Sequence, residues 1–177
     1  MASFVATWGS TASERALPFP CDRALPQPDD ALFRAVDVDA PAPLVFRWLC
    51  QLKVAPYSYD WIDNFGRQSP RRLIPGLEKL AVGQRFMGLF ELVAFEPDRH
   101  LTLCLRGSPT FGDVAVTYLV VPTGERSTRL VVKLLMRYAR FLPVRFVARW
   151  IAPALDLVMM RKQLLTLKRL AEGPAET

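Results

Sequence analysis

The sequence predicts one α+β domain in which a curved antiparallel β-sheet wraps around a long C-terminal helix. Two observations carry this prediction. Strand-like segments follow one another with only short turns between them, which is typical of an antiparallel meander. The segment from Pro143 to Glu172 then carries an apolar stripe that can be buried only if the helix lies on the sheet. A chain of 177 residues, 51% of them hydrophobic, is long enough to bury such a core.

The first part of the domain is predicted to be a strand followed by two short helices. The strand is expected from Leu32 to Asp39, where residues alternate between two faces. One face carries Phe33, Ala35 and Asp37, and the other carries Leu32, Val36 and Val38. A helix is expected from Leu44 to Leu52, because Pro41 and Pro43 suit the first turn of a helix. The second short helix is expected from Tyr57 to Gly66.

The meander is predicted from four segments that are bounded by glycine, proline and aspartate. They are Gln84 to Phe95 (bent near Gly88), Leu101 to Arg106, Val114 to Val121 and Ser127 to Tyr138. The final helix is expected to kink or restart at Pro153. Beyond that point its apolar residues recur at intervals of three and four: Leu157, Met160, Leu164, Leu167 and Ala171.

The domain organisation is predicted to be simple. Residues 1–30 contain four prolines, which fix φ and lack an N–H donor, so this segment is expected to be an extended arm. A single domain is expected over residues 31–173, followed by a tail at 174–177.

The charge of the chain is unevenly distributed. The net charge is +6, and between Arg129 and Arg169 the only acidic residue among ten basic ones is Asp156. Such a bias can mark an anionic partner, either a lipid surface or nucleic acid. No arginine-rich run or alternation of aromatic and basic residues supports nucleic acid, so a solvated basic face is favoured, and transient contact with an anionic membrane is left open. The apolar stretch from Phe141 to Met160 contains three charged residues, which disfavours a transmembrane helix.

The residues that usually hold metals or carry out nucleophilic catalysis are sparse. Cys21, Cys50 and Cys104 are far apart and form no CxxC pair, which disfavours both a disulfide framework and a zinc site and favours a reducing cytoplasm. His100 is the only histidine, so no metal cluster or serine–histidine–aspartate set can be built around it. No glycine-rich phosphate-binding motif is present. We therefore expect no metal, no nucleotide and no other cofactor.

Several stretches resemble the START-like superfamily, also called SRPBCC, and in particular a bacterial branch without assigned activity. These stretches are Ala-Pro-Ala-Pro-Leu-Val-Phe-Arg-Trp-Leu at 40–49, Tyr-Ser-Tyr-Asp-Trp-Ile-Asp-Asn at 57–64, Thr-Arg-Leu at 128–130, and the terminal-helix segments at 160–164 and 167–172. The superfamily includes pollen allergens, lipid-transfer domains and polyketide cyclases/dehydrases. The resemblance covers Leu32 to Glu172 and implies a helix-grip fold around a hydrophobic cavity. The ring-hydroxylating members match poorly, because their iron–sulfur pattern is missing.

Three functions follow as hypotheses. The first is the binding of a hydrophobic small molecule, lipid-, polyketide- or aromatic-like, by a carrier or sensor. The second is a cyclase or dehydratase that needs neither metal nor nucleotide, and the third is a peripheral membrane protein that handles lipids. No catalytic residue is assigned, and the sequence leaves the ligand and the oligomeric state open. The residues expected to line the cavity are Trp48, Tyr57, Tyr59, Asp60, Trp61, Phe90, Arg106, Tyr118, Arg137, Leu157, Met160 and Leu164.

Overall fold

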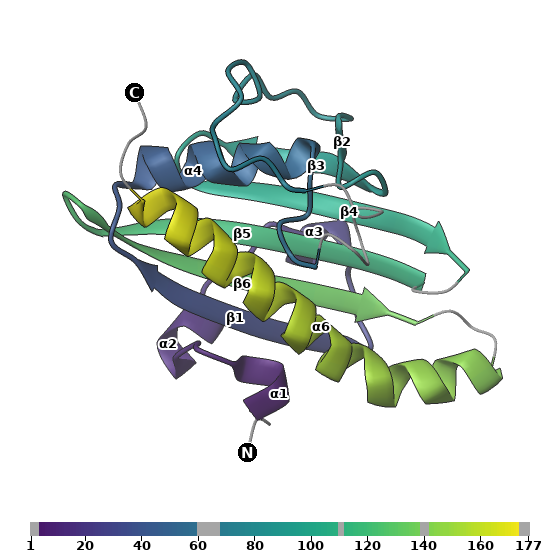
Figure 1. The fold of residues 1–177 in the computed structure, drawn as a ribbon. Helices are drawn as coiled ribbons and strands as arrows, with labels where there is room; N and C mark the ends of the chain where they lie inside the picture. Colours follow the sequence, from purple (N-terminus) through teal and green to yellow (C-terminus); the bar gives the residue numbers. More distant parts are fainter. Residues whose placement is uncertain (1–3, 60–67, 110–111, 139–141, 174–177) are drawn as a thin grey trace.

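The computed structural model describes residues 4–59, 68–109, 112–138 and 142–173. Six antiparallel strands form one curved sheet in the order β1-β6-β5-β4-β3-β2, and the long helix α6 lies across one of its faces (Figure 1). The strands are β1 (Asp30–Val38), β2 (Arg85–Phe86), β3 (Phe90–Glu96), β4 (His100–Ser108), β5 (Gly112–Gly124) and β6 (Ser127–Arg137). Among the described residues, the helices that follow β1 are α4 (Ala42–Cys50), the short 3-10 helix η1 (Gln51–Lys53) and α6 (Leu142–Glu172).

The sheet follows the predicted meander, with one difference. The segment predicted as one bent strand is a hairpin of β2 and β3, because Met87 and Gly88 both adopt left-handed φ angles, of 47° and 72°, and reverse the chain. The first strand closes the sheet at the far side by pairing with β6, from Asp30 opposite Met136 to Val38 opposite Thr128. A register shift between Leu92 and Ala94 interrupts the pairing of β3 with β4, and such irregularities bend a strand.

The helices after β1 form much as predicted. Pro41 has extended dihedral angles and precedes α4, whose buried side chains include Val45, Trp48 and Leu49. The predicted helix from Leu44 to Leu52 therefore corresponds to α4 together with η1. Of the second predicted helix, Tyr57 to Gly66, the first residues form a bend, and residues 60–67 lie outside the described part of the chain.

Helix α6 grips the concave face of the sheet. It runs without interruption through Pro153, and Figure 1 shows its N-terminal part at an angle to the rest, as the proline predicts. The stripe residues Met160, Leu164, Leu167 and Ala171 are all buried. Over the residues that the structure describes, no helix is long and apolar enough to cross a membrane.

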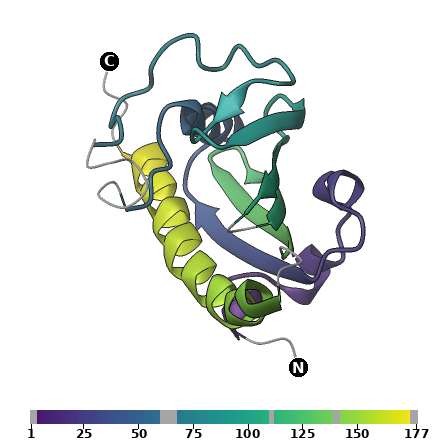
Figure 2. The ribbon, with the colours of Figure 1, turned by 90° about the vertical axis from the view of Figure 1, so that its right-hand side faces the viewer.

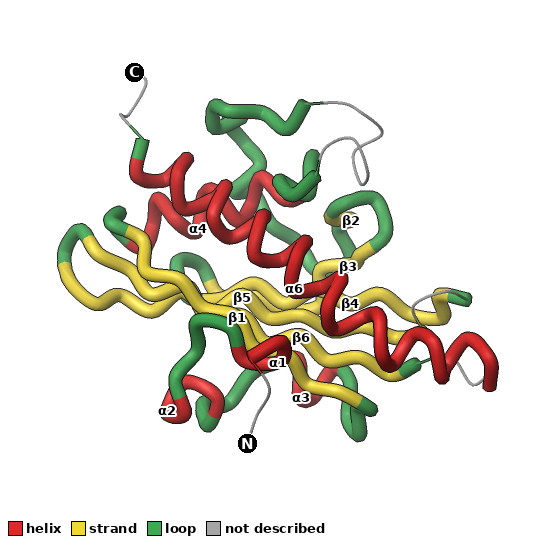
Figure 3. The backbone as a smooth tube through the Cα atoms, turned by 60° about the horizontal axis from the view of Figure 1, so that its bottom comes forward, coloured by secondary structure: helices red, strands yellow, loops and turns green. Residues whose placement is uncertain are grey.

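The N-terminal segment corrects the prediction of an extended arm. It contains three four-residue helices, α1 (Phe4–Thr7), α2 (Ala12–Arg15) and α3 (Cys21–Ala24). Figure 3 shows α2 and α3 on the side of the sheet opposite α6, and Figure 2 shows the sheet between α6 and α3. Phe19, Cys21 and Leu25 pack there in a second core of buried apolar residues. The segment is therefore part of the fold, while the division of the chain at residue 30 stays a prediction.

Several contacts tie this segment to the sheet. The Ala35 N–H donates to the Trp8 carbonyl oxygen at 3.1 Å, which covers part of the open edge of β1. The chain passes so close to β1 at Gly9 that a side-chain Cβ there would lie 2.1 Å from the Ala35 carbonyl oxygen. Arg129 forms an ion pair with Glu14 at 2.7 Å, so one base of the predicted basic segment is neutralised from the N-terminal segment.

Candidate functional site

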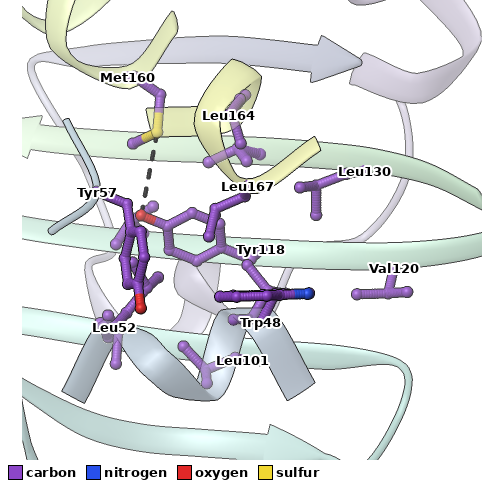
Figure 4. Packing of buried hydrophobic residues seen from close by; sticks show 14 of the residues in the cluster. Trp48, Leu52, Tyr57, Leu101, Tyr118, Val120, Leu130, Met160, Leu164 and Leu167 are labelled. Atoms are coloured by element: carbon purple, nitrogen blue, oxygen red, sulfur yellow. Dashed lines mark hydrogen bonds between the residues drawn. The ribbon is translucent and has the colours of Figure 1, made fainter. Parts of the chain in front are cut away.

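The space between the sheet and α6 is occupied by apolar side chains. Trp48 of α4, Tyr118 of β5 and Met160 of α6 converge there with Tyr57, and Figure 4 shows how they interlock. Tyr57 and Trp48 meet edge to face with ring centroids 6.2 Å apart. The sequence predicts a cavity at this position; the described side chains there are buried and pack against one another, and Trp48, for example, is only 5% exposed.

A charged pair is buried at the β1 side of this interior. Arg34 has no solvent-exposed surface, and its Nη2 atom donates to Asp156 Oδ2 of α6 at 2.7 Å. Its Nη1 atom donates to the Phe33 carbonyl oxygen at 2.8 Å, whereas its Nε atom has no hydrogen-bond partner among the described residues. The inward face of β1 thus holds a guanidinium between Leu32 and Val36, two residues of the apolar core.

Burial changes the protonation of both members of this pair. It raises the pKa of Asp156 from 3.8 to about 6, although the neighbouring Arg34 guanidinium acts in the opposite direction. Burial also lowers the pKa of Arg34, and Asp156 opposes that change. The site therefore contains a carboxyl group that exchanges its proton close to neutral pH.

This shifted pKa predicts how stability depends on pH. Because folded Asp156 binds its proton more tightly than the unfolded chain does, its contribution to stability falls as the pH rises from about 4 to about 6. Asp156→Asn removes this titration. The free energy of unfolding of the wild type, relative to that of the variant, should fall by about 3 kcal/mol between pH 4 and pH 7. Urea unfolding of both proteins across this range measures it, and parallel pH profiles would contradict it.

A second polar group connects β5 to α6. The Tyr118 hydroxyl donates to Gln163 Oε1 at 2.7 Å, and Gln163 Nε2 donates to the Pro56 carbonyl oxygen at 2.7 Å. Burial raises the pKa of Tyr118, with the charge of Asp156 acting in the same direction, so the hydroxyl stays neutral at physiological pH. Met160 Sδ lies 4.0 Å from the same hydroxyl (Figure 4). Tyr118 is thus a neutral donor held in the interior by its contact with α6.

The structure brings together some of the sequence-predicted cavity residues and separates others. Five lie in the buried interior: Trp48, Tyr57, Tyr118, Met160 and Leu164. Phe90, Leu157 and Tyr59 are half-buried, with Phe90 packed against the core. Arg106 is exposed, and Arg137 pairs with Asp113 at 3.5 Å away from the interior. Asp60 and Trp61 lie outside the described residues.

Sequence reasoning did not select Arg34, Asp156 or Gln163 for the site. The alternation of β1 places Arg34 on the same face as Leu32 and Val36. A charged residue on this apolar face was the sequence signal for a buried polar site. Asp156 stood out as the only acid in a basic segment. Gln163 lies three residues after Met160 and four before Leu167, which puts it on the buried face of α6.

The described residues form surface hollows along α6, including the following two. One, of about 170 Å³, is lined by Tyr57, Ser58, Ser69, Arg71, Lys162, Thr166, Arg169 and Leu170. The other, of about 390 Å³, lies at the end of the helix beside Leu165, Lys168, Arg169, Glu172 and Gly173. In the described part of the chain, no group of three or more histidine, cysteine, aspartate or glutamate side chains is placed to hold a metal ion.

Comparison with solved structures agrees with the architecture. The Zhui aromatase/cyclase from Streptomyces sp. R1128 superposes with a TM-score of 0.55 over 81% of this chain and 93% of its own, at 14% identity. The chain has the helix-grip fold. The di-domain aromatase/cyclase BexL from the BE-7585A biosynthetic pathway gives a TM-score of 0.53 at 16% identity, over 81% of this chain and 46% of its own. The hypothetical protein jhp0584 from Helicobacter pylori gives 0.55 at 16% identity, over 88% and 96%.

These likenesses confirm the fold that the START-like resemblance implied, and at such low identity they show the fold alone. No protein-family model matches the sequence, and a search of the curated proteins finds no match.

Proposed function

We propose that the protein binds a hydrophobic small molecule between the sheet and α6, as a carrier or a sensor. The observation that carries this proposal is the Arg34–Asp156 pair, which is buried in a mainly apolar interior. Replacing a buried ion pair by apolar residues is often neutral or stabilising, so the fold does not require such a pair here. A guanidinium with an unused Nε–H beneath α6 is well suited to bind a polar group on a mainly apolar ligand.

Binding requires that the interior open. Trp48 and Tyr57 occupy the space next to Tyr118, and Tyr57 lies outside any helix or strand, in a left-handed conformation with φ of 56°. We propose that the ligand displaces these two aromatic side chains and takes over their contacts. The fold likeness to Zhui and BexL, both aromatase/cyclases, favours an aromatic or polyketide-like ligand.

Binding of an uncharged aromatic pair tests this proposal. The wild type should bind 1-naphthol saturably and about tenfold more tightly than naphthalene, because the hydroxyl gains a hydrogen bond to the buried pair. In the double variant Arg34→Met/Asp156→Leu this preference should disappear while naphthalene still binds. Isothermal titration calorimetry measures both affinities. Absence of saturable binding, together with native mass spectrometry showing no co-purified ligand, would refute the proposal.

A second candidate is a cyclase or dehydratase that acts on a polyketide-like substrate without metal or nucleotide. Asp156 favours it, because a carboxyl group with a pKa of about 6 can accept and return a proton near neutral pH. Arg34, 2.7 Å away, could stabilise an enolate oxygen. Turnover of such a substrate by the wild type and its loss in Asp156→Asn would support the enzyme, whereas binding without turnover supports the carrier.

A third candidate is a peripheral membrane protein that handles lipids. Ile151, Leu155 and Val158 are each at least half exposed and lie on one side of α6 at helical spacing. Binding to anionic vesicles that weakens with salt would favour it.

A further inference from the structure

The hollow of about 170 Å³ lies where the segment after η1 meets α6. Three cationic side chains line it: Arg71 from the loop before β2, and Lys162 and Arg169 from α6. All three are exposed, and within the described ranges none forms an ion pair with an aspartate or glutamate. The hollow thus gathers positive charge from two separate parts of the chain.

Several other basic residues of the same region do form ion pairs with acidic residues. Arg129 pairs with Glu14, Lys133 with Asp22 at 2.6 Å, and Lys168 with Glu172 at 2.5 Å. Those cations are therefore largely neutralised by the chain itself, whereas the charge around the hollow has no such acidic partner among the described residues. Uncompensated cations that surround a concave site attract an anion more strongly than the same charges on a convex surface.

The size of the hollow limits what it can hold. Pockets for drug-sized ligands are typically about 300–1,000 Å³, so 170 Å³ accommodates a single polar group rather than a whole ligand. Two guanidinium groups and one ammonium are the donors that recognise carboxylate and phosphate oxygens.

The hollow is also next to the buried interior. Tyr57 lines the hollow, yet its side chain is only 1% exposed and it packs inside against Trp48. Tyr57 therefore lies between the cationic surface and the apolar core. A molecule that extended from one to the other would pass Tyr57.

From this arrangement we propose that the hollow beside Arg71, Lys162 and Arg169 is an oxyanion site, which holds the phosphomonoester or carboxylate end of an amphipathic ligand. The apolar part of that ligand extends past Tyr57 into the interior. The placement of the apolar part in the interior rests on the proposed function, whereas the anion site itself does not.

Calorimetry with two matched amphiphiles tests the inference. At low ionic strength the wild type should bind dodecyl phosphate, below its micelle concentration, at least about tenfold more tightly than dodecanol. Lys162→Ala/Arg169→Ala should bind the two equally. Both residues are exposed, so the variant should keep its melting temperature. The matched control, Arg85→Ala/Arg126→Ala, removes the same charge from exposed positions that do not line the hollow and should keep the preference.

The outcomes separate the anion site from the proposed function. Equal affinity of the wild type for the two amphiphiles, or the same loss in the control variant, would overturn the oxyanion site. A different result would show a site for free phosphate and overturn the amphipathic ligand. In that case dodecanol would not bind, dodecyl phosphate and inorganic phosphate would bind with equal affinity, and Lys162→Ala/Arg169→Ala would weaken the binding of both phosphates alike. Binding of dodecanol tests the proposed function independently of the hollow, because dodecanol carries no anionic group.

Discussion

Met160→Arg is expected to destabilise the protein by about 3 kcal/mol or more and to lower its melting temperature by roughly 10 °C. Met160 is 8% exposed and lies on the buried side of α6, beside the Tyr118 hydroxyl. An arginine there would place a charge in the apolar interior. Asp156, one helical turn away, is already paired with Arg34. A domain of this size has only about 5–15 kcal/mol of stability, so insoluble protein is a further expected sign of the loss.

Val158→Arg is the matched control, because it introduces the same residue two positions along the same helix. Val158 is 51% exposed, so the change should stay within about 0.5 kcal/mol. Arg161→Met, at the neighbouring position, is less suitable as a control. The Arg161 guanidinium lies 5.5 Å from the Trp8 ring, a cation–π contact that contributes about 0.5–1 kcal/mol. Equal thermal melts for Met160→Arg and the wild type would show that the inward face of α6 is wrongly assigned.

Arg34→Met is the second change with a large expected effect, a loss of about 3–5 kcal/mol at pH 7. It leaves the Asp156 carboxylate, whose side chain is 12% exposed, without its partner in the interior. Because Arg34 holds the pKa of Asp156 down, that pKa should rise further in the variant. Neutral Asp156 tolerates burial better, so the deficit should shrink as the pH falls toward 5. Urea unfolding at pH 5 and pH 7 measures both effects.

The double variant Arg34→Met/Asp156→Leu decides what the pair is for. With both charges replaced by apolar side chains, stability should return to the wild-type value or exceed it. Such recovery would mean that the pair serves recognition or chemistry rather than the fold. If the double variant were as unstable as Arg34→Met, the pair would be a structural element, and the observation that carries the proposed function would lose its force.

The periodicity of the hydrophobic residues and the spacing of the turn residues were enough to predict most of the sheet and the buried face of α6. The alternation in β1 correctly separated Leu32 and Val36, which face α6, from Ala35, which packs in the second core. The stripe of Met160, Leu164 and Leu167 is buried as predicted. These predictions succeed because a hydrophobic period depends only on local geometry.

Two features were beyond such reasoning. Whether the interior is hollow or filled depends on the volumes of side chains from distant elements, such as Trp48 and Tyr118, which no single segment specifies. The helices of the N-terminal segment are only four residues long, too short to be stable alone, so they depend on tertiary packing. The Thr11–Glu14 capping box was a local signal for α2 that the count of prolines obscured. Ligand binding, the site residues and a cytoplasmic location stay predictions.

The pairing of β1 with β6 has a consequence for how the chain acquires its structure. Asp30 lies opposite Met136, so the strand made first pairs with the strand made last. A chain emerging from the ribosome therefore carries β1 without its neighbour until β6 has been synthesised. Contacts between residues so distant in sequence slow folding and leave strand edges open to other chains in the meantime. Trp8, whose carbonyl oxygen accepts a hydrogen bond from the Ala35 N–H, precedes β1 in the chain, so it is already synthesised and can cover part of one edge of β1 during this interval.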